Sequence, residues 1–120
     1  MTLDEVLQRV AGTAYFLDEV PGNPNQRGLF DNYPLHIVAG WGDCEGIRLL
    51  LAAGACIDQR GEHGFTPLME AVLHGHRDAA LLLIELGAGP VRNDDGQSPS
   101  EYASIAGQEA LASVLAERGY

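Results

Sequence analysis

Four histidines give this sequence its clearest opportunity for metal or acid–base chemistry. Three of them, His63, His74 and His76, fall in one short stretch. Imidazole nitrogens bind zinc and can exchange a proton near neutral pH. Zinc sites combine them with cysteines or carboxylates at short, regular spacings, and no such residue stands at that spacing here. We therefore expect no metal site and no bound cofactor.

Other reactive residue types also lack the neighbours that catalysis needs. Cys44 and Cys56 are the only cysteines, form no C-x-x-C, and are expected as free thiols in a reducing cytoplasm. The glycine-rich stretch "GAGPVRNDDG" has neither the lysine nor the spacing of a phosphate-binding loop. No set of residues provides a nucleophile, a base and an oxyanion hole. The sequence predicts a protein without catalytic residues, not an enzyme.

The charge balance narrows the class of partner. The chain has 120 residues with 17 aspartates and glutamates against 7 basic residues, all of them arginine, for a net charge of −10. Nucleic acids and anionic membranes attract basic surfaces, so both are expected to be excluded as partners. A basic protein would be attracted. The start "MTLDEVLQRV" does not resemble a signal peptide, and we expect a cytoplasmic protein.

A repeated pattern indicates how the chain is built. Prolines stand at 34, 67 and 99, which are 33 and 32 residues apart. A hydroxyl-bearing residue precedes each proline, a glycine follows eight residues later, and a second glycine follows twenty residues after the proline. The hydroxyl-bearing residues are Tyr33, Thr66 and Ser98, and the glycines are Gly42, Gly75 and Gly107, then Gly54, Gly87 and Gly119. Such internal periodicity is typical of repeat proteins.

Each part of this pattern has a structural meaning. Proline suits the first turn of a helix, and a hydroxyl before it can cap the helix. Glycine readily ends a helix. Apolar residues at helical spacing, as in Ile47, Leu50 and Leu51, follow the first glycine. Each unit is therefore predicted to contain a turn, a short helix, a tight turn, a longer helix and a final turn.

Two segments, "YPLHIVAGWGDCEGIRLLLAAGACID" and "GFTPLMEAVLHGHRDAALLLIELGAG", resemble ankyrin repeats in their T-P-L-H-type opening and period. The resemblance covers about residue 29 to the C-terminus. It implies an all-α ankyrin-repeat solenoid with short hairpin-like loops, called fingers, between units. It further suggests a small stand-alone protein of bacterial type. In this family pattern His36 is structural and bonds the backbone of a neighbouring repeat.

The N-terminus is expected to be a degenerate capping repeat. "NQRG" at 25–28 matches "DQRG" at 58–61, which places residues 1–20 on a pair of helices. We expect one domain of four repeats and eight helices, at 1–28, 29–60, 61–92 and 93–120. The alternative is a single long N-terminal helix. The finger "GAGPVRNDDGQ" is one residue short and contains Pro90, so a distorted hairpin is expected between the last two repeats.

The family resemblance also implies where a partner would dock, namely on the finger tips and on the inner face near the first helix of each unit. The corresponding residues are Leu29, Phe30, Asn32, Trp41, Arg60, Glu62, His63, Phe65, Leu73, His74, Asp94, Asp95 and Gln97. Exposed aromatic side chains often anchor interfaces, with polar residues at the rim. In the alternative interpretation, Leu29 and Phe30 pack on the N-terminal cap and Trp41 fills a gap between repeats.

Three classes of function follow. The first is a non-catalytic protein–protein interaction module, monomeric when free. Its specific form would be an immunity or inhibitor protein for a basic toxin or enzyme. The second is a structural scaffold or self-associating assembly module. The third is an enzyme that uses a metal held by His63, His74 and His76.

Overall fold

The computed structural model describes residues 1–120 and contains seven α-helices and two short 3-10 turns, without strands. The helices are α1 (Leu3–Ala11), α2 (Pro34–Trp41), α3 (Cys44–Ala52), α4 (Pro67–Leu73), α5 (Arg77–Glu85), α6 (Pro99–Ile105) and α7 (Glu109–Glu117). The 3-10 turns are η1 (Leu29–Asp31) and η2 (Glu62–Gly64). The predicted all-α fold class is confirmed. No helix combines the length and the apolar character needed to cross a membrane.

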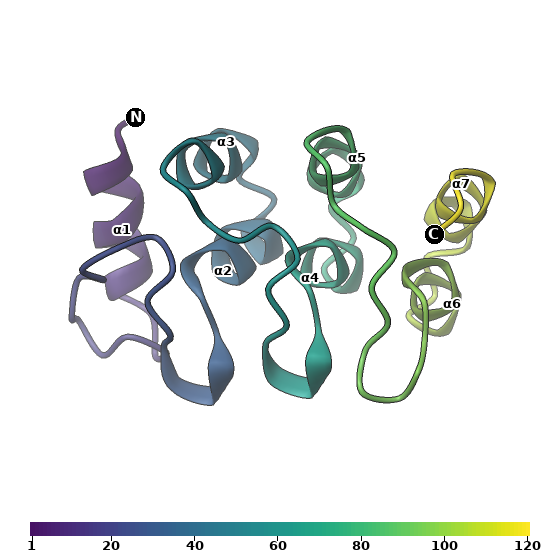
Figure 1. Ribbon diagram of the computed structural model, residues 1–120, viewed down its shortest axis with the longest axis horizontal. Helices are drawn as coiled ribbons and strands as arrows, with labels where there is room; N and C mark the ends of the chain where they lie inside the picture. Colours follow the sequence, from purple (N-terminus) through teal and green to yellow (C-terminus); the bar gives the residue numbers. More distant parts are fainter.

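The helices form two rows in an elongated molecule of 38 × 25 × 20 Å. Figure 1 shows α2, α4 and α6 in one row, α3, α5 and α7 in the other, and α1 at the N-terminal end. The fingers project beside the row of α2, α4 and α6 (Figure 1). Along the rows α2 contacts α4, α4 contacts α6 and α3 contacts α5, and the two helices of each pair also contact each other. This arrangement is a helical solenoid.

The repeated prolines begin the first helix of each pair as expected, and two of the three hydroxyls cap their helices. Pro34, Pro67 and Pro99 each open a helix. The Ser98 hydroxyl accepts from the backbone N–H of Glu101, and the Glu101 carboxylate accepts from the backbone N–H of Ser98, which completes a capping box. The Thr66 hydroxyl caps α4 alone, and Tyr33 provides no side-chain cap for α2.

Glycine ends α2 because this position is both left-handed and crowded. Gly42 has φ +72°, a conformation in which a side chain is strained. A β-carbon there would lie 2.6 Å from Nδ1 of His76, which occupies the corresponding turn of the next pair. Gly42 therefore lets the first two helix pairs approach closely, and His76 packs in that contact.

A continuous apolar core runs along the solenoid. Its fully buried members come from both rows and include Val38, Ile47, Leu68, Leu83 and Leu115. His36 lies in the same interior with 2% exposure, and its Nε2 donates to the Phe65 carbonyl at 2.9 Å. Burial holds the pKa of His36 below its ordinary value, so the ring is neutral near pH 7. His36 thus joins two units, as its place in the repeat predicts.

The expected second helix of the N-terminal unit does not form, so the prediction of eight helices was wrong. The alternative, a single long N-terminal helix, was also wrong, because α1 ends at Ala11. Residues 13–18 make turns, and both Leu17 and Asp18 have positive φ. The Thr13 hydroxyl donates to the Val10 carbonyl at 2.7 Å and so completes α1 instead of capping a new helix. Phe16 then turns inward and is 5% exposed. No proline or capping residue offers a second start.

The three fingers share one closing hydrogen bond and differ at one backbone position. The bonds run from Gly28 to Asn32, from Gly61 to Phe65 and from Asn93 to Gln97, donor first, at 2.8, 2.7 and 3.1 Å. The first finger has left-handed residues at 30 and 31, the second at 63 and 64, and the third only at 96. The third finger therefore differs from the other two in the backbone conformation of its tip.

We expect Ser98→Ala to lower the free energy of unfolding by about 1 kcal/mol, because it removes the hydroxyl that accepts from the Glu101 N–H and caps α6. Urea denaturation followed by circular dichroism measures this change. Ser104→Ala is the matched control, since Ser104 is exposed and bonds only the exposed Glu109 side chain. Equal midpoints for the two variants would contradict this role of the cap.

Candidate functional site

The first helix of each pair presents equivalent positions on the finger side of the solenoid. One row of equivalent positions holds Ile37, Glu70 and Tyr102, and the spacing is again 33 and 32 residues. Unlike the core positions, this row changes chemical character from one unit to the next. Variable side chains on a regular scaffold are what a specific binding surface requires.

The structure leaves most of the predicted contact residues accessible. Those that are exposed are Leu29, Phe30, Trp41, Arg60, Glu62, His63, Leu73, His74, Asp94 and Asp95. Phe65 and Gln97 are half-buried, and Asn32 is buried. Their accessibility is compatible with docking, and their role in binding stays a prediction.

Asn32 is the exception to the expected exposure. It is 7% exposed, and its side-chain amide donates to the carbonyls of Leu29 and Phe30 at 3.3 and 3.2 Å. The amide folds under the first finger because those carbonyls turn inward at η1 and need donors. Asn32 therefore shapes the finger from inside, and its contact with a partner stays a prediction.

Phe30 forms the most exposed aromatic tip. Its side chain is 70% exposed and its φ is +57°, a left-handed conformation that disfavours a bulky residue by about 1–2 kcal/mol. The closing bond of the finger holds the chain in this conformation. Phe30 thus does not pack on the N-terminal unit, in contrast to the alternative interpretation.

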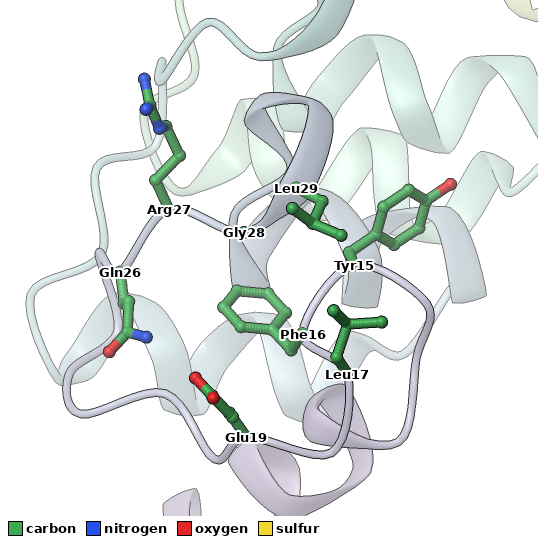
Figure 2. A pocket seen from close by; sticks show the side chains of 8 residues that line it. All are labelled: Tyr15, Phe16, Leu17, Glu19, Gln26, Arg27, Gly28 and Leu29. Atoms are coloured by element: carbon green, nitrogen blue, oxygen red, sulfur yellow. The ribbon is translucent and has the colours of Figure 1, made fainter.

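Leu29, by contrast, borders a hollow of about 300 Å³ in the N-terminal unit. Figure 2 shows Tyr15, Leu17 and Leu29 on one side of this hollow, with Phe16 near its centre. Gln26, Arg27 and Glu19 lie on the opposite side (Figure 2). The Leu29 N–H also donates to the Tyr15 carbonyl at 2.8 Å, which fixes the finger to the N-terminal turns.

Trp41 contacts the N-terminal helix and stays partly open. The Arg9 guanidinium lies 5.0 Å from the centre of its ring, and Arg9 pairs with Asp43 at 3.2 Å. Trp41 nevertheless keeps 39% of its surface exposed. Trp41 therefore contacts the neighbouring N-terminal unit while leaving an aromatic surface accessible, and its role in binding stays a prediction.

A groove lies between α2 and α4, with a volume of about 310 Å³. The residues that line it are Tyr15, Asn32, His36, Ile37, Gly40, Trp41, Glu70 and His74. It joins predicted contact residues to others that sequence reasoning missed: Tyr15, Ile37 and Glu70. The helical spacing could have indicated Ile37 and Glu70, because they occupy equivalent positions one turn before Trp41 and His74.

Glu70 carries the most perturbed carboxyl group of this surface. Its side chain is 17% exposed. Burial, reinforced by repulsion from Glu62 and opposed by His63, raises its pKa to about 7. The Nε2 of His74 lies 3.9 Å from Oε2 of Glu70, which is beyond hydrogen-bond distance.

The second and third fingers are joined to each other. Nη2 of Arg60 lies 2.6 Å from Oδ1 of Asp94, although both side chains are about half exposed. Phe65 packs edge-on against Tyr102 with ring centres 4.7 Å apart, so α6 supports the base of the second finger. These contacts hold several predicted contact residues in fixed positions.

The three histidines considered as metal ligands are not brought together on this surface. No group of three or more histidine, cysteine, aspartate or glutamate side chains is placed to hold a metal ion, so His63, His74 and His76 do not combine. His63 stands on a finger tip, while His76 packs between helix pairs. The arrangement is suited to contact with another surface.

Comparison with known proteins agrees with this description. The family model described as ankyrin repeats (three copies) matches residues 11–94. The chain is 46% identical over 68 residues to human protein phosphatase 1 regulatory subunit 27, covering 56% of this chain and 44% of that protein. It is 37% identical over 71 residues to the probable 26S proteasome regulatory subunit p28 of Saccharomyces cerevisiae, covering 58% of this chain and 31% of that protein.

A bacterial relative is similar over a shorter stretch. A putative ankyrin-containing lipoprotein of Leifsonia xyli is 60% identical over 37 residues, covering 31% of this chain and 15% of that protein. The chain spans less than half the length of the curated relatives described here. The similarity therefore concerns the repeat region and not those whole proteins.

We expect Glu70→Gln to stabilise the protein at pH 8 and to leave its stability unchanged near pH 4. The Glu70 pKa is about 7 when folded and 4.5 ordinarily, so the folded state retains the proton more strongly. Ionisation therefore destabilises the wild type progressively as pH rises from about 4.5 through 7. At 1.4 kcal/mol per pKa unit, the gain at pH 8 is up to about 3 kcal/mol.

Urea titrations of both proteins across this pH range measure the difference. Glu85→Gln changes an exposed side chain of α5 and is the control. Its free energy of unfolding should differ from that of the wild type by a small amount that is the same at every pH. A stability difference between wild type and Glu70→Gln that does not grow with pH would contradict a desolvated Glu70.

Proposed function

This chain belongs to the ankyrin-repeat family, and on that premise we propose that it is a non-catalytic protein that binds a partner through the α2–α4 groove and the finger tips. Ankyrin repeats are protein–protein interaction modules. The observation that carries the proposal is the exposure of Leu29, Phe30, Trp41 and Leu73 along one side of the solenoid. Such apolar side chains stabilise a complex when a partner buries them.

Binding by this surface would require little rearrangement. Each finger is closed by a backbone hydrogen bond, and Arg60 joins two fingers through Asp94. A preorganised surface loses less conformational entropy on binding than a flexible one does. Recognition by a rigid scaffold is therefore the mechanism that we propose.

The partner that we propose is a basic protein. The net charge is −10, and exposed Glu62, Asp94 and Asp95 lie at the finger tips. Complementary charge accelerates encounter and disfavours acidic competitors. Inhibition of a basic enzyme or toxin, including an immunity role, is the specific form in which such binding would occlude the partner's surface.

The relatives' names and the free thiols support two further parts of the proposal. Two relatives are named as regulatory subunits, and we extend to this chain only regulation by direct binding. Cys44 and Cys56 are free, and we propose that the protein acts as a monomer in the reducing cytoplasm.

We expect Phe30→Ala to weaken capture of the partner by about tenfold or more while stability changes by less than about 0.5 kcal/mol. The phenyl ring is 70% exposed, so it contributes little to the core. The measurement is affinity capture from extracts of the cells that produce the protein, followed by titration of the captured protein. Leu86→Ala changes a comparably apolar residue at the end of α5, in the other row, and serves as the control.

Equal capture by wild type and Phe30→Ala, with loss in Leu86→Ala, would place binding on the opposite face. Light scattering of the free protein at micromolar concentration completes the test. A dimer that Phe30→Ala converts to monomer would assign this surface to self-association, the scaffold alternative.

A further inference from the structure

The partly buried carboxylates of this protein differ in whether they accept a hydrogen bond. Asp43, Asp58 and Glu70 are the acidic residues that are not exposed. Asp43 accepts from the backbone N–H of Gly46, and Asp58 accepts from that of Gly89, both at 2.9 Å. Glu70 accepts no hydrogen bond from any protein donor. An enclosed carboxylate without a donor is unfavourable, and a ligand that provides one would bind there.

The groove beside Glu70 has room for such a ligand. Gly40 lies opposite on α2, and a β-carbon built there would stand only 3.2 Å from the His74 ring and 4.0 Å from Oε2 of Glu70. A side chain at this position would crowd the groove beside His74 and Glu70, and glycine avoids this. The groove's volume of about 310 Å³ is at the small end of ligand pockets and suits one side chain better than a cofactor.

The charges around the groove favour a cation. Besides Glu70 itself, the titratable groups that face this region are Glu62 and His63 on η2, His74 on α4 and Tyr102 on α6, and Tyr15 and the neutral His36 also line the groove. At the Trp41 ring, Arg9 is already paired with Asp43. The Glu70 carboxylate therefore lacks a counterion within hydrogen-bond distance.

The geometry points to a binding site for one arginine side chain of the partner protein, placed in the α2–α4 groove with the Glu70 carboxylate as its acceptor. This inference rests on the proposed function and names the chemistry that the groove recognises. A guanidinium can donate two parallel hydrogen bonds to a carboxylate and can also stack on aromatic rings such as those of Trp41 and Tyr15. An apolar side chain would leave Glu70 desolvated and unpaired, and an acidic one would be repelled.

Burial already raises the pKa of Glu70 to about 7, which bears on how the site would respond to pH. Below that value the group is protonated and a guanidinium gains no ion pair. As pH rises through 7, the carboxylate ionises and the cation compensates its charge. Binding of arginine is therefore expected to tighten from about pH 6 to about pH 8.

The only tryptophan lines the groove, so its fluorescence reports occupancy directly. The probes are the short peptides acetyl-Gly-Arg-Gly-amide, its lysine counterpart and its citrulline counterpart, which is neutral but nearly the same shape. We expect saturable binding of the arginine peptide, about tenfold weaker binding of the citrulline peptide and intermediate binding of the lysine peptide.

Glu70→Gln should remove the preference for arginine over citrulline, whereas Glu85→Gln, an exposed acid on α5, should keep it. The inference is overturned if citrulline binds as tightly as arginine, if lysine binds more tightly than arginine, or if Glu70→Gln retains the preference. Circular dichroism of each variant confirms that it is folded.

The capture experiment with Phe30→Ala separates this inference from the proposed function. A captured partner whose affinity is equal for wild type and Glu70→Gln overturns the arginine site and leaves the proposed function intact. Arginine-peptide binding that depends on Glu70, in a protein whose finger tips capture no partner, supports the site and overturns the proposed function.

Discussion

The contact between neighbouring helix pairs is the constraint on which the rest of this structure depends. A single pair of short helices cannot bury its apolar side chains alone, and stacking gives Leu68 and Leu83 a continuous interior. The His36 side chain bonds the Phe65 carbonyl across that contact, and Gly42 permits the close approach of His76. These interactions fix the spacing of α2 and α4, and hence the width of the groove between them.

Positions that repeat from unit to unit and positions that do not repeat have different structural roles. Prolines, glycines and core leucines recur because every unit must meet its neighbours in the same way. The positions of the first helices that border the groove carry less of this constraint, so the buried Ile37 and the half-buried Glu70 and Tyr102 can differ. A rigid backbone then holds unlike side chains in register. Specific binding becomes possible without any unit departing from the common fold.

Sequence periodicity was sufficient to predict the helix pairs. It was insufficient to predict features that depend on contacts between distant parts of the chain. Pro67 and Thr66 mark the start of α4 by local chemistry alone, and the structure agrees. The segment that begins at Thr13 does not form the predicted helix. The Thr13 hydroxyl bonds the Val10 carbonyl at the end of α1 instead of a backbone N–H of a following helix. The burial of Asn32 was not predictable because it depends on how the finger turns. The place of Glu70 beside His74 could be predicted from the helical spacing, but its desolvation could not, because that arises from elements far apart in the sequence.

Binding on the α2–α4 groove and the finger tips is the central claim made for this protein. The most direct test is to record amide chemical shifts of the isotope-labelled protein by NMR, free and bound to its captured partner. The largest shift changes are expected in η1, η2 and the adjoining α2 and α4. Changes concentrated in α3, α5 and α7, with the fingers unaffected, would contradict the claim.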